Sequence, residues 1–186
     1  MVIALLSLLS RYGKLEEKQK PKFELLWGKE HPYLHYGEFL NVGQIERLWR
    51  IGVYNRSPVN TIYDVEVKLT HMEPKVNVVI PAPLHRMGDN PLKSDERYET
   101  TMYIHPMDTK YMDVIGQLNT NELFIYYADK ALPQKLPIRN SSEQYHLTIK
   151  VVGRDIAPRA RNFKTYLDNN GKLIIEPKGD SYELSE

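Results

Sequence analysis

The chain lacks cysteine altogether, and this absence removes several classes of site at once. Without cysteine there is no disulfide framework, no thiolate zinc site, no cysteine nucleophile and no blue-copper centre. At 186 residues the chain does not need such cross-links, because a domain of this size buries about two-thirds of its unfolded surface. We therefore expect one domain held together by an ordinary hydrophobic core.

The sequence also lacks an excess of charge of one sign. Its 25 Lys and Arg residues are nearly balanced by 24 Asp and Glu residues, which gives a net charge of +1. A dedicated nucleic-acid-binding protein usually carries a strong basic excess, so we expect no nucleic-acid partner. Glycine-rich phosphate-binding loops and the G-x-S-x-G turn of serine hydrolases are absent as well.

What the chain does have is an unusual start. Residues 1–10, MVIALLSLLS, carry no charged side chain, whereas residues 11–22 carry five basic residues against two acidic ones, a net charge of +3. The members of this basic collar are Arg11, Lys14, Lys18, Lys20 and Lys22. A helix of ten residues is about 15 Å long, which is too short to cross a hydrocarbon core of about 30 Å. An apolar run followed by a basic run is nevertheless typical of the inner half of a membrane anchor.

Three interpretations of this start stay open. The segment is a shallow or truncated membrane anchor, a short helix packed on the domain or on a second copy of the chain, or the remnant of a signal peptide. The first interpretation predicts that the domain lies at the cytoplasmic face of a membrane, with the membrane surface as a partner of residues 1–22. The second predicts a homo-oligomer, and without an anchor we expect a cytoplasmic protein.

The middle of the chain predicts strands rather than helices. Apolar and polar residues alternate clearly in three stretches, Thr61–His71, Leu48–Tyr54 and Tyr145–Val152. Alternation of this kind indicates antiparallel strands with one buried and one wet face. Shorter candidates with weaker alternation are Lys22–Trp27, Val76–Ile80, Glu99–His105, Thr109–Ile115, Glu122–Tyr127, Asn162–Leu167 and Lys172–Glu176.

Short strands separated by turn signals about every ten residues predict an all-β fold. We expect an antiparallel immunoglobulin-like β-sandwich with Greek-key connections, with a jelly roll as second choice and a closed barrel as third. The expected domain organisation is a short helix and the basic collar over residues 1–20, the sandwich over 21–177 and an acidic tail over 178–186. Asp168-Asn-Asn-Gly171 predicts a hairpin turn. Two long connections, Pro81–Tyr98 and Asp129–Glu143, and the irregular stretch Pro32–Arg47 interrupt the strands.

Two histidines have the spacing of a metal-binding pair. His31 and His35 would share one face of a helix, as metal-binding histidines do. Pro32 lies between them and would have to stand at a helix start, and the general-base glutamate of the metalloprotease motif is missing. We therefore expect neither a metal nor a cofactor.

The segment Leu84–Asn90 gathers four polar side chains, those of His85, Arg86, Asp89 and Asn90. An acid/base pair of His85 and Asp89 is the basis of a hydrolase hypothesis, but catalysis also requires a positioned nucleophile or metal, and no motif marks one. We therefore expect no catalytic residue here. A turn capped by Asp89 and Asn90 is the structural alternative, and a binding loop is the functional one.

A third group of candidates follows the strand Tyr145–Val152. We expect Gly153 to adopt a positive φ where that strand ends, and we take Arg154 and Asp155 as candidate binding residues. Arg154, with Arg159 and Arg161 nearby, is a candidate for binding an anionic partner. The alternative is that these charges protect an exposed strand edge against pairing with another sheet.

Several segments, taken in order, resemble a set of uncharacterised prokaryotic and phage-borne proteins. The resemblance rests on Lys20-Pro-Lys-Phe-Glu-Leu25, LWRIGVYN (48–55), VEVKLTHMEP (65–74), Pro83-Leu-His85, Asp89-Asn-Pro91 and Gly153-Arg-Asp155, and it covers most of residues 20–177. It implies a single immunoglobulin-like sandwich behind a short N-terminal membrane anchor, and it implies no activity. These residues are strand and turn features rather than a catalytic signature.

Together these observations predict a non-catalytic binding module near a membrane, with an unknown protein as its partner. The long connections at 81–98 and 129–143 are the expected contact surfaces, because a sandwich gathers its loops at its ends. The alternative is a structural subunit of a virion or surface complex that docks through its N-terminal arm. A hydrolase centred on His85 and Asp89 is the third hypothesis.

Overall fold

The computed structural model describes residues 21–39, 43–75, 78–87, 100–118, 122–125, 134–136 and 143–183. The expected helix over residues 1–20 lies outside these ranges, together with Arg11, Lys14, Lys18 and Lys20 of the collar. All regular structure in the described ranges is β-strand, so they contain no apolar helix of membrane-spanning length.

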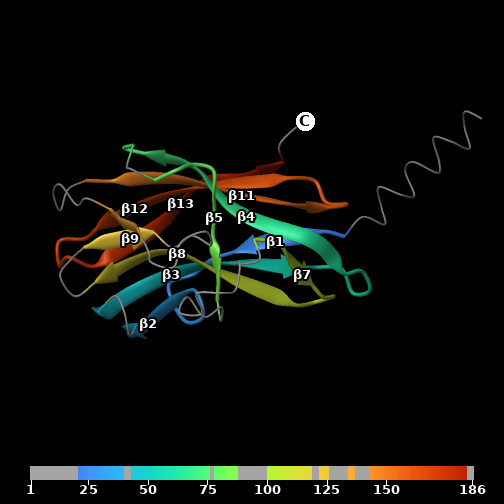
Figure 1. Ribbon diagram of the computed structural model, residues 1–186, viewed down its shortest axis with the longest axis horizontal. Coiled ribbons are helices and arrows are strands. Elements are labelled where there is room, and N and C mark those ends of the chain that lie inside the picture. The colour runs from blue at the N-terminus through green and yellow to red at the C-terminus, as the bar shows by residue number, and fades with distance from the viewer. Residues whose placement is uncertain are drawn as a thin grey trace, which may run out of the picture.

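Thirteen strands form two antiparallel sheets, which lie one above the other in Figure 1. The first sheet has seven strands: β1 (Phe23–Leu26), β2 (Leu34–Phe39), β3 (Gly43–Asn55), β6 (His85–Arg86), β8 (Thr109–Leu118), β9 (Leu123–Ile125) and β10 (Gln134–Leu136). The second has six: β4 (Ile62–Glu73), β5 (Ala82–Pro83), β7 (Met102–Ile104), β11 (Tyr145–Arg154), β12 (Arg159–Leu167) and β13 (Leu173–Glu183). Because the sheets stay separate, the fold is not a closed barrel.

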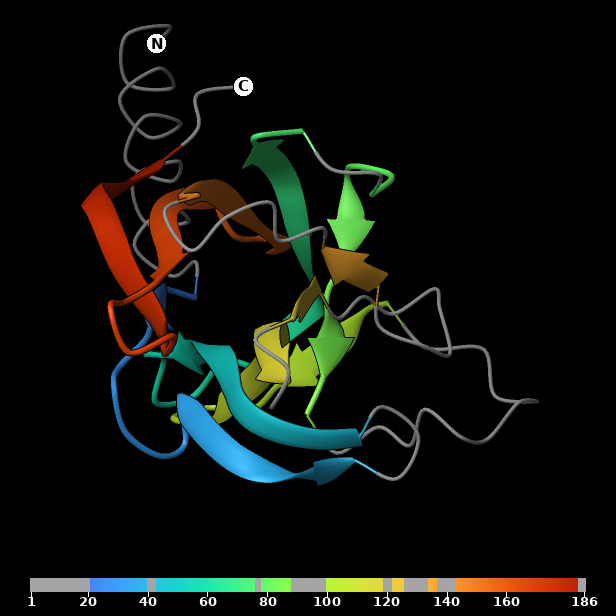
Figure 2. The ribbon, with the colours of Figure 1, turned by 90° about the vertical axis from the view of Figure 1, so that its left-hand side faces the viewer.

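The first sheet runs in the order β1-β3-β8-β9-β10, with β2 also paired to β3 and β6 to β8. The second runs β13-β12-β11-β4-β5, with β7 also paired to β4. Figure 2 shows how the two sheets curve around the interior of the domain, which the core side chains fill. Consecutive strands therefore lie in different sheets at several points, first where β3 leads to β4.

The core lies between the two sheets and follows directly from the alternation in the sequence. In β11, Tyr145, Leu147, Ile149 and Val151 are buried, while the residues between them are half-buried. Side chains of a strand point alternately to its two faces, so a period of two places every second residue in the core. Inner-face residues from both sheets form one continuous apolar cluster, the arrangement of a β-sandwich.

Aromatic rings join the sheets near one edge. The Trp49 ring from β3 meets the Phe163 ring from β12 with 4.9 Å between centroids, and Trp27 meets Phe163 at 6.0 Å. Both pairs are edge-to-face, the geometry that the ring quadrupole favours. The guanidinium of Arg161 covers Trp27 at 3.5 Å from its ring centroid. These contacts fix β12 against the first sheet.

Most expected strands are present, and the exceptions have physical reasons. The stretch expected at Val76–Ile80 is not a strand over its described residues 78–80, where Val79 is exposed. Conversely, β2 occupies part of the stretch Pro32–Arg47 that was expected to be irregular, because Leu34–Phe39 pairs with β3 through the backbone. Neither β2 nor the short β5, β6 and β10 has enough alternating residues to be recognised alone.

Two local expectations concern the turns and ends of the last strands. The expected hairpin turn is confirmed: Asp168 accepts hydrogen bonds from the Asn170 and Lys172 N–H groups at 2.8 Å, and Gly171 has φ 72°. We expected the sandwich to end at residue 177, but β13 continues to Glu183, which is the register partner of Arg159.

The expectation for Gly153 is wrong. The residue with positive φ after β11 is Asp155, at 61°, and Gly153 is not among the glycines with positive φ in the described ranges. A Cβ on Gly153 would lie 3.0 Å from Ile156 Cδ1 and 3.2 Å from the Tyr63 carbonyl oxygen. The position therefore needs a glycine for close packing rather than for its backbone angle.

Candidate functional site

Three charged or titratable residues from three neighbouring strands meet inside the first sheet. Arg50 of β3 and His85 of β6 are both register partners of Asp113 on β8. Residues directly opposite each other on antiparallel strands have neighbouring side chains. The backbone pairing thus brings together residues that lie 63 and 28 positions apart in the sequence.

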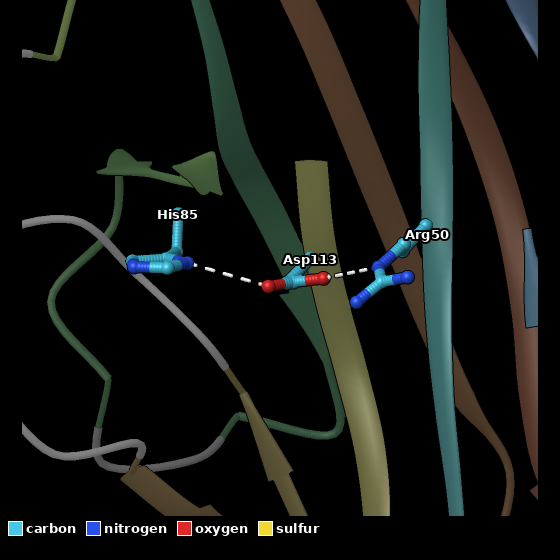
Figure 3. Close-up of polar contacts among 3 residues, drawn as sticks. All are labelled: Arg50, His85 and Asp113. Carbon is cyan, nitrogen blue, oxygen red and sulfur yellow. Dashed lines mark hydrogen bonds and ion pairs between the residues drawn. The ribbon is translucent and has the colours of Figure 1, made fainter. Parts of the chain in front are cut away.

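Asp113 is the centre of this cluster, which we call the Asp113 cluster (Arg50, His85 and Asp113). Its Oδ1 accepts a hydrogen bond from Arg50 Nε at 2.6 Å, and its Oδ2 lies 3.3 Å from His85 Nδ1 (Figure 3). The guanidinium is on one side of the carboxylate and the imidazole is on the other. One carboxylate therefore holds two side chains from different strands.

All three side chains are buried. Arg50 is 6% exposed, His85 3% and Asp113 2%. Taking isolated charges out of water costs several kcal/mol each, so such groups are stable in a fold only when they are paired. The Arg50–Asp113 pair meets that need with a short charge-assisted hydrogen bond.

The cluster lies on the face of the first sheet that points away from the shared core. Trp49 and Ile51, on either side of Arg50, belong to the core, so the pleat directs Arg50 to the opposite face. Leu48 and Phe124 are fully buried and are not part of the shared core cluster. The outer face of this sheet is therefore covered as well.

Tyr33 and His35 lie at the rim of the Asp113 cluster. The Tyr33 carbonyl accepts the Arg50 N–H at 2.7 Å, and the Tyr33 and Tyr111 rings are 5.8 Å apart. Burial lowers the pKa of His35, with further lowering by the Arg50 guanidinium and His31 and an opposing effect of Asp113. Burial and the neighbouring Tyr111 raise the pKa of Tyr33.

This geometry bears directly on the hydrolase hypothesis. A carboxylate on Nδ1 can orient an imidazole and fix its tautomer, which is the supporting half of an acid/base pair. Here that carboxylate is Asp113, and it also neutralises Arg50. Asp89 and Asn90 lie outside the described residues, and the neighbouring Arg86 is half-buried on β6.

The sequence signal for this cluster was present but weak. Arg50 interrupts the apolar run LWRIGV, and Asp113 interrupts YMDVIG, so each is a charge within a buried strand. A charge in that position needs a partner, but the sequence alone does not say which one. His85 is therefore a candidate from the sequence, whereas Arg50 and Asp113 are recognised only in the structure.

The three arginines at the end of β11 and the start of β12 do not form one basic patch. Arg154 is ion-paired with Asp64, and its guanidinium lies 6.0 Å from the Tyr63 ring centroid. Arg159 instead donates to the Phe23 carbonyl on β1 of the first sheet at 3.2 Å, whereas Arg161 donates to the Gly179 carbonyl on β13 of its own sheet at 3.1 Å. Their role in the described structure is to close the edge of the sandwich. Asp155 is exposed in the turn after Arg154.

The two histidines that have the spacing of a metal-binding pair lie close together, but in the described residues they are not part of a group of three ligating side chains. The His31 and His35 rings are 6.3 Å apart. Across the part of the chain that the structure describes, no three His, Asp or Glu side chains are grouped as a metal site requires.

A small cavity lies elsewhere, between the start of β13 and the first sheet. Its volume is about 170 Å³, and its walls include Trp49, Leu173 and Ile175. Its wall also includes the cations Lys29 and Arg47, and Arg47 donates a hydrogen bond to the Leu173 carbonyl at 3.1 Å. His85 does not line this cavity.

Comparisons of the chain with models of protein families, with curated proteins and with solved structures gave no match.

Proposed function

We propose that the protein is a non-catalytic β-sandwich module that works by binding and is held near the cytoplasmic face of a membrane by its N-terminal segment. The observation that carries this proposal is the junction between that segment and the domain. The basic collar ends at Lys22, and β1 begins at the next residue. The Lys22 carbonyl accepts the Arg56 N–H at 2.8 Å, so the chain leaves the domain at a fixed point.

The buried state of His85 favours binding over hydrolysis. A general base must reach the proton that it removes, and His85 is 3% exposed. Its Nδ1 partner is the carboxylate that also pairs with Arg50. We interpret the Asp113 cluster as a structural connection of β3, β6 and β8.

For the fold, we propose that the sandwich has the Greek-key connections of an immunoglobulin-like domain. Its support is that the chain passes between the two sheets between successive long strands, as from β3 to β4. The last three strands, β11, β12 and β13, form a simple meander. A crystal structure that traces residues 88–99, 126–133 and 137–142 would test the Greek-key connections directly.

Membrane fractionation tests the proposed location. The full chain should sediment with membranes, and a chain of residues 21–186 should stay in the supernatant and keep the β-sheet circular dichroism signal of the folded domain. Replacing Lys14, Lys18 and Lys20 with Gln should weaken binding to anionic vesicles by about 3 kcal/mol, at about 1 kcal/mol per cation near the surface. Failure of the full chain to associate with membranes would overturn the proposal.

The same chains test the alternative of a structural subunit. If residues 1–20 dock on a neighbouring copy, light scattering of the full chain will show a discrete oligomer that is lost in the chain of residues 21–186. A monomer in detergent that binds vesicles supports the membrane proposal instead.

A further inference from the structure

Exposed apolar side chains gather at one end of the sandwich. Of the six large apolar residues that are exposed in the described part of the chain, four lie where β3 ends and β4 begins: Val59, Tyr63, Tyr103 and Met107. We call this region the entry end, because β1 also starts there, with Phe23 paired to Asn55. In Figure 1 it is the right-hand end, with β7 and the loop between β3 and β4.

The side chains of the entry end contact one another across different elements. The Tyr63 and Tyr103 rings are 5.5 Å apart, edge to face. The Tyr54 hydroxyl donates to Met107 Sδ at 3.3 Å. Exposed aromatic and apolar groups in one contiguous region mark an interaction surface more often than single exposed residues do.

This surface is built on loops that are held rigidly. Asn55 is fully buried, and its Nδ2 donates to the carbonyls of Asn60 at 2.7 Å, Ile104 at 3.0 Å and His105 at 3.1 Å. Its Oδ1 accepts the Ser57 N–H at 2.9 Å. One side chain therefore ties the loop that carries Val59 to the loop that carries Met107. A surface that is already ordered loses little conformational entropy when it binds.

The N-terminal segment leaves the domain at this same end. Lys22 is hydrogen-bonded to Arg56, in the loop that also carries Val59. Twenty residues precede Pro21, and they include the apolar run and four of the five collar cations. Any surface that holds this segment is therefore tethered to the domain at the entry end.

The charges at the entry end do not oppose contact with an anionic surface. Arg56 lies 3.7 Å from Glu24, Lys110 lies 2.9 Å from Asp108, and Arg154 is paired with Asp64. The paired groups are close to neutral overall, so the attraction to anionic headgroups comes from the collar. Tyrosine suits such a boundary because its ring is apolar and its hydroxyl is polar.

We propose that the entry end rests on the lipid bilayer, with Val59, Tyr103 and Met107 in the headgroup region beside the point where the N-terminal segment enters. This inference rests on the proposed membrane attachment and adds the orientation of the domain. The long axis of the strands then stands away from the membrane, and the opposite end of the sandwich is free for a protein partner. An amphipathic helix in such an interface buries its apolar face about 5–10 Å into the headgroup boundary, and we expect a similar depth for these side chains.

The absence of cysteine makes a direct test simple. Val59 is 76% exposed and Val79, which follows the far end of β4, is 80% exposed, so they form a matched pair. Single variants Val59→Cys and Val79→Cys of the full chain would carry an environment-sensitive fluorophore. Each would be mixed with vesicles of phosphatidylcholine and phosphatidylglycerol, with and without a quencher attached to the acyl chains.

The expected result is a blue shift and lipid quenching for the label at position 59, with neither for the label at 79. If the chain sediments with the vesicles but both labels stay in water, the orientation is wrong and the membrane attachment stands. If the chain does not sediment with vesicles at all, both proposals fail. A shift of the label at 59 that depends on protein concentration without lipid would show that a second copy covers the entry end, which also overturns the inference.

Discussion

Arg50 and Asp113 form an ion pair inside the first sheet, with 2.6 Å between Nε and Oδ1 and less than a tenth of either side chain exposed. Pairs of this kind are costly to break, because removal of one partner leaves a buried charge without compensation. They are much less costly to replace as a whole, since apolar residues of similar volume also fill the space.

Asp113→Asn should therefore destabilise the domain by about 3–5 kcal/mol, measured by urea unfolding. Glu24→Gln is the matched control, because the Glu24–Arg56 pair is largely exposed at 3.7 Å and should contribute at most about 1 kcal/mol. The double variant Arg50→Met, Asp113→Leu should recover most of the loss. Equal losses for Asp113→Asn and Glu24→Gln would contradict the structural role of the cluster.

Stability should depend on pH through His35. Its pKa in the folded chain is below the ordinary value of 6.5. At a pH between these two pKa values, the unfolded chain therefore binds more protons than the folded one. The contribution of His35 is fully present above pH 6.5 and is lost as the pH falls through the lowered pKa. His35→Gln should flatten the fall in melting temperature between neutral and mildly acidic pH, and the exposed His71→Gln should not. Identical profiles for wild type and His35→Gln would contradict this prediction.

Asn55→Ala should loosen both loops of the entry end together. The change removes a side chain that makes hydrogen bonds to four backbone groups, with an expected loss of about 3 kcal/mol. Amide hydrogen exchange should increase at residues 56–60 and at 104–108, although these segments are far apart in sequence. Asn60→Ala is the control, since Asn60 enters this network through its backbone carbonyl. Faster exchange in only one of the loops would show that Asn55 does not connect them.

Gly116→Ala should destabilise the first sheet by about 1–3 kcal/mol, because there is no space for the added methyl group. A Cβ at this position would lie 2.1 Å from Phe124 Cζ, and Phe124 is fully buried. Combining Gly116→Ala with Phe124→Leu should cost less than the two single changes added together. By contrast, Gly179→Ala meets no atom within 4 Å, so its cost of about 1–2 kcal/mol would come only from its positive φ. Additive losses at 116 and 124 would rule out the clash.

The strands and their buried faces were predictable from local pattern. The alternation in Thr61–His71 and Tyr145–Val152 corresponds to β4 and β11. The apolar residues expected on the buried face of each strand are in the core, except Tyr63, which is exposed near the start of β4. This works because the side-chain period of a strand is two and the burial of one face is a local demand on the sequence. The same reasoning fails for β2 and β10, where pairing through the backbone decides the structure.

The sequence by itself determined an all-β chain without thiol chemistry, with an apolar and basic start and a set of alternating strands. Only the tertiary structure decided which distant residues meet. His85 was a candidate from its sequence neighbours, but its partner is Asp113 on another strand, and Arg50 joins them from a third. Likewise, Val59, Tyr103 and Met107 are unremarkable in the sequence and come together through the pairing of β7 with β4 and the hydrogen bonds of Asn55 to Asn60, Ile104 and His105. Local patterns fix which face of a strand is buried, whereas neighbours across a sheet depend on pairing and register, and those are settled by the whole fold.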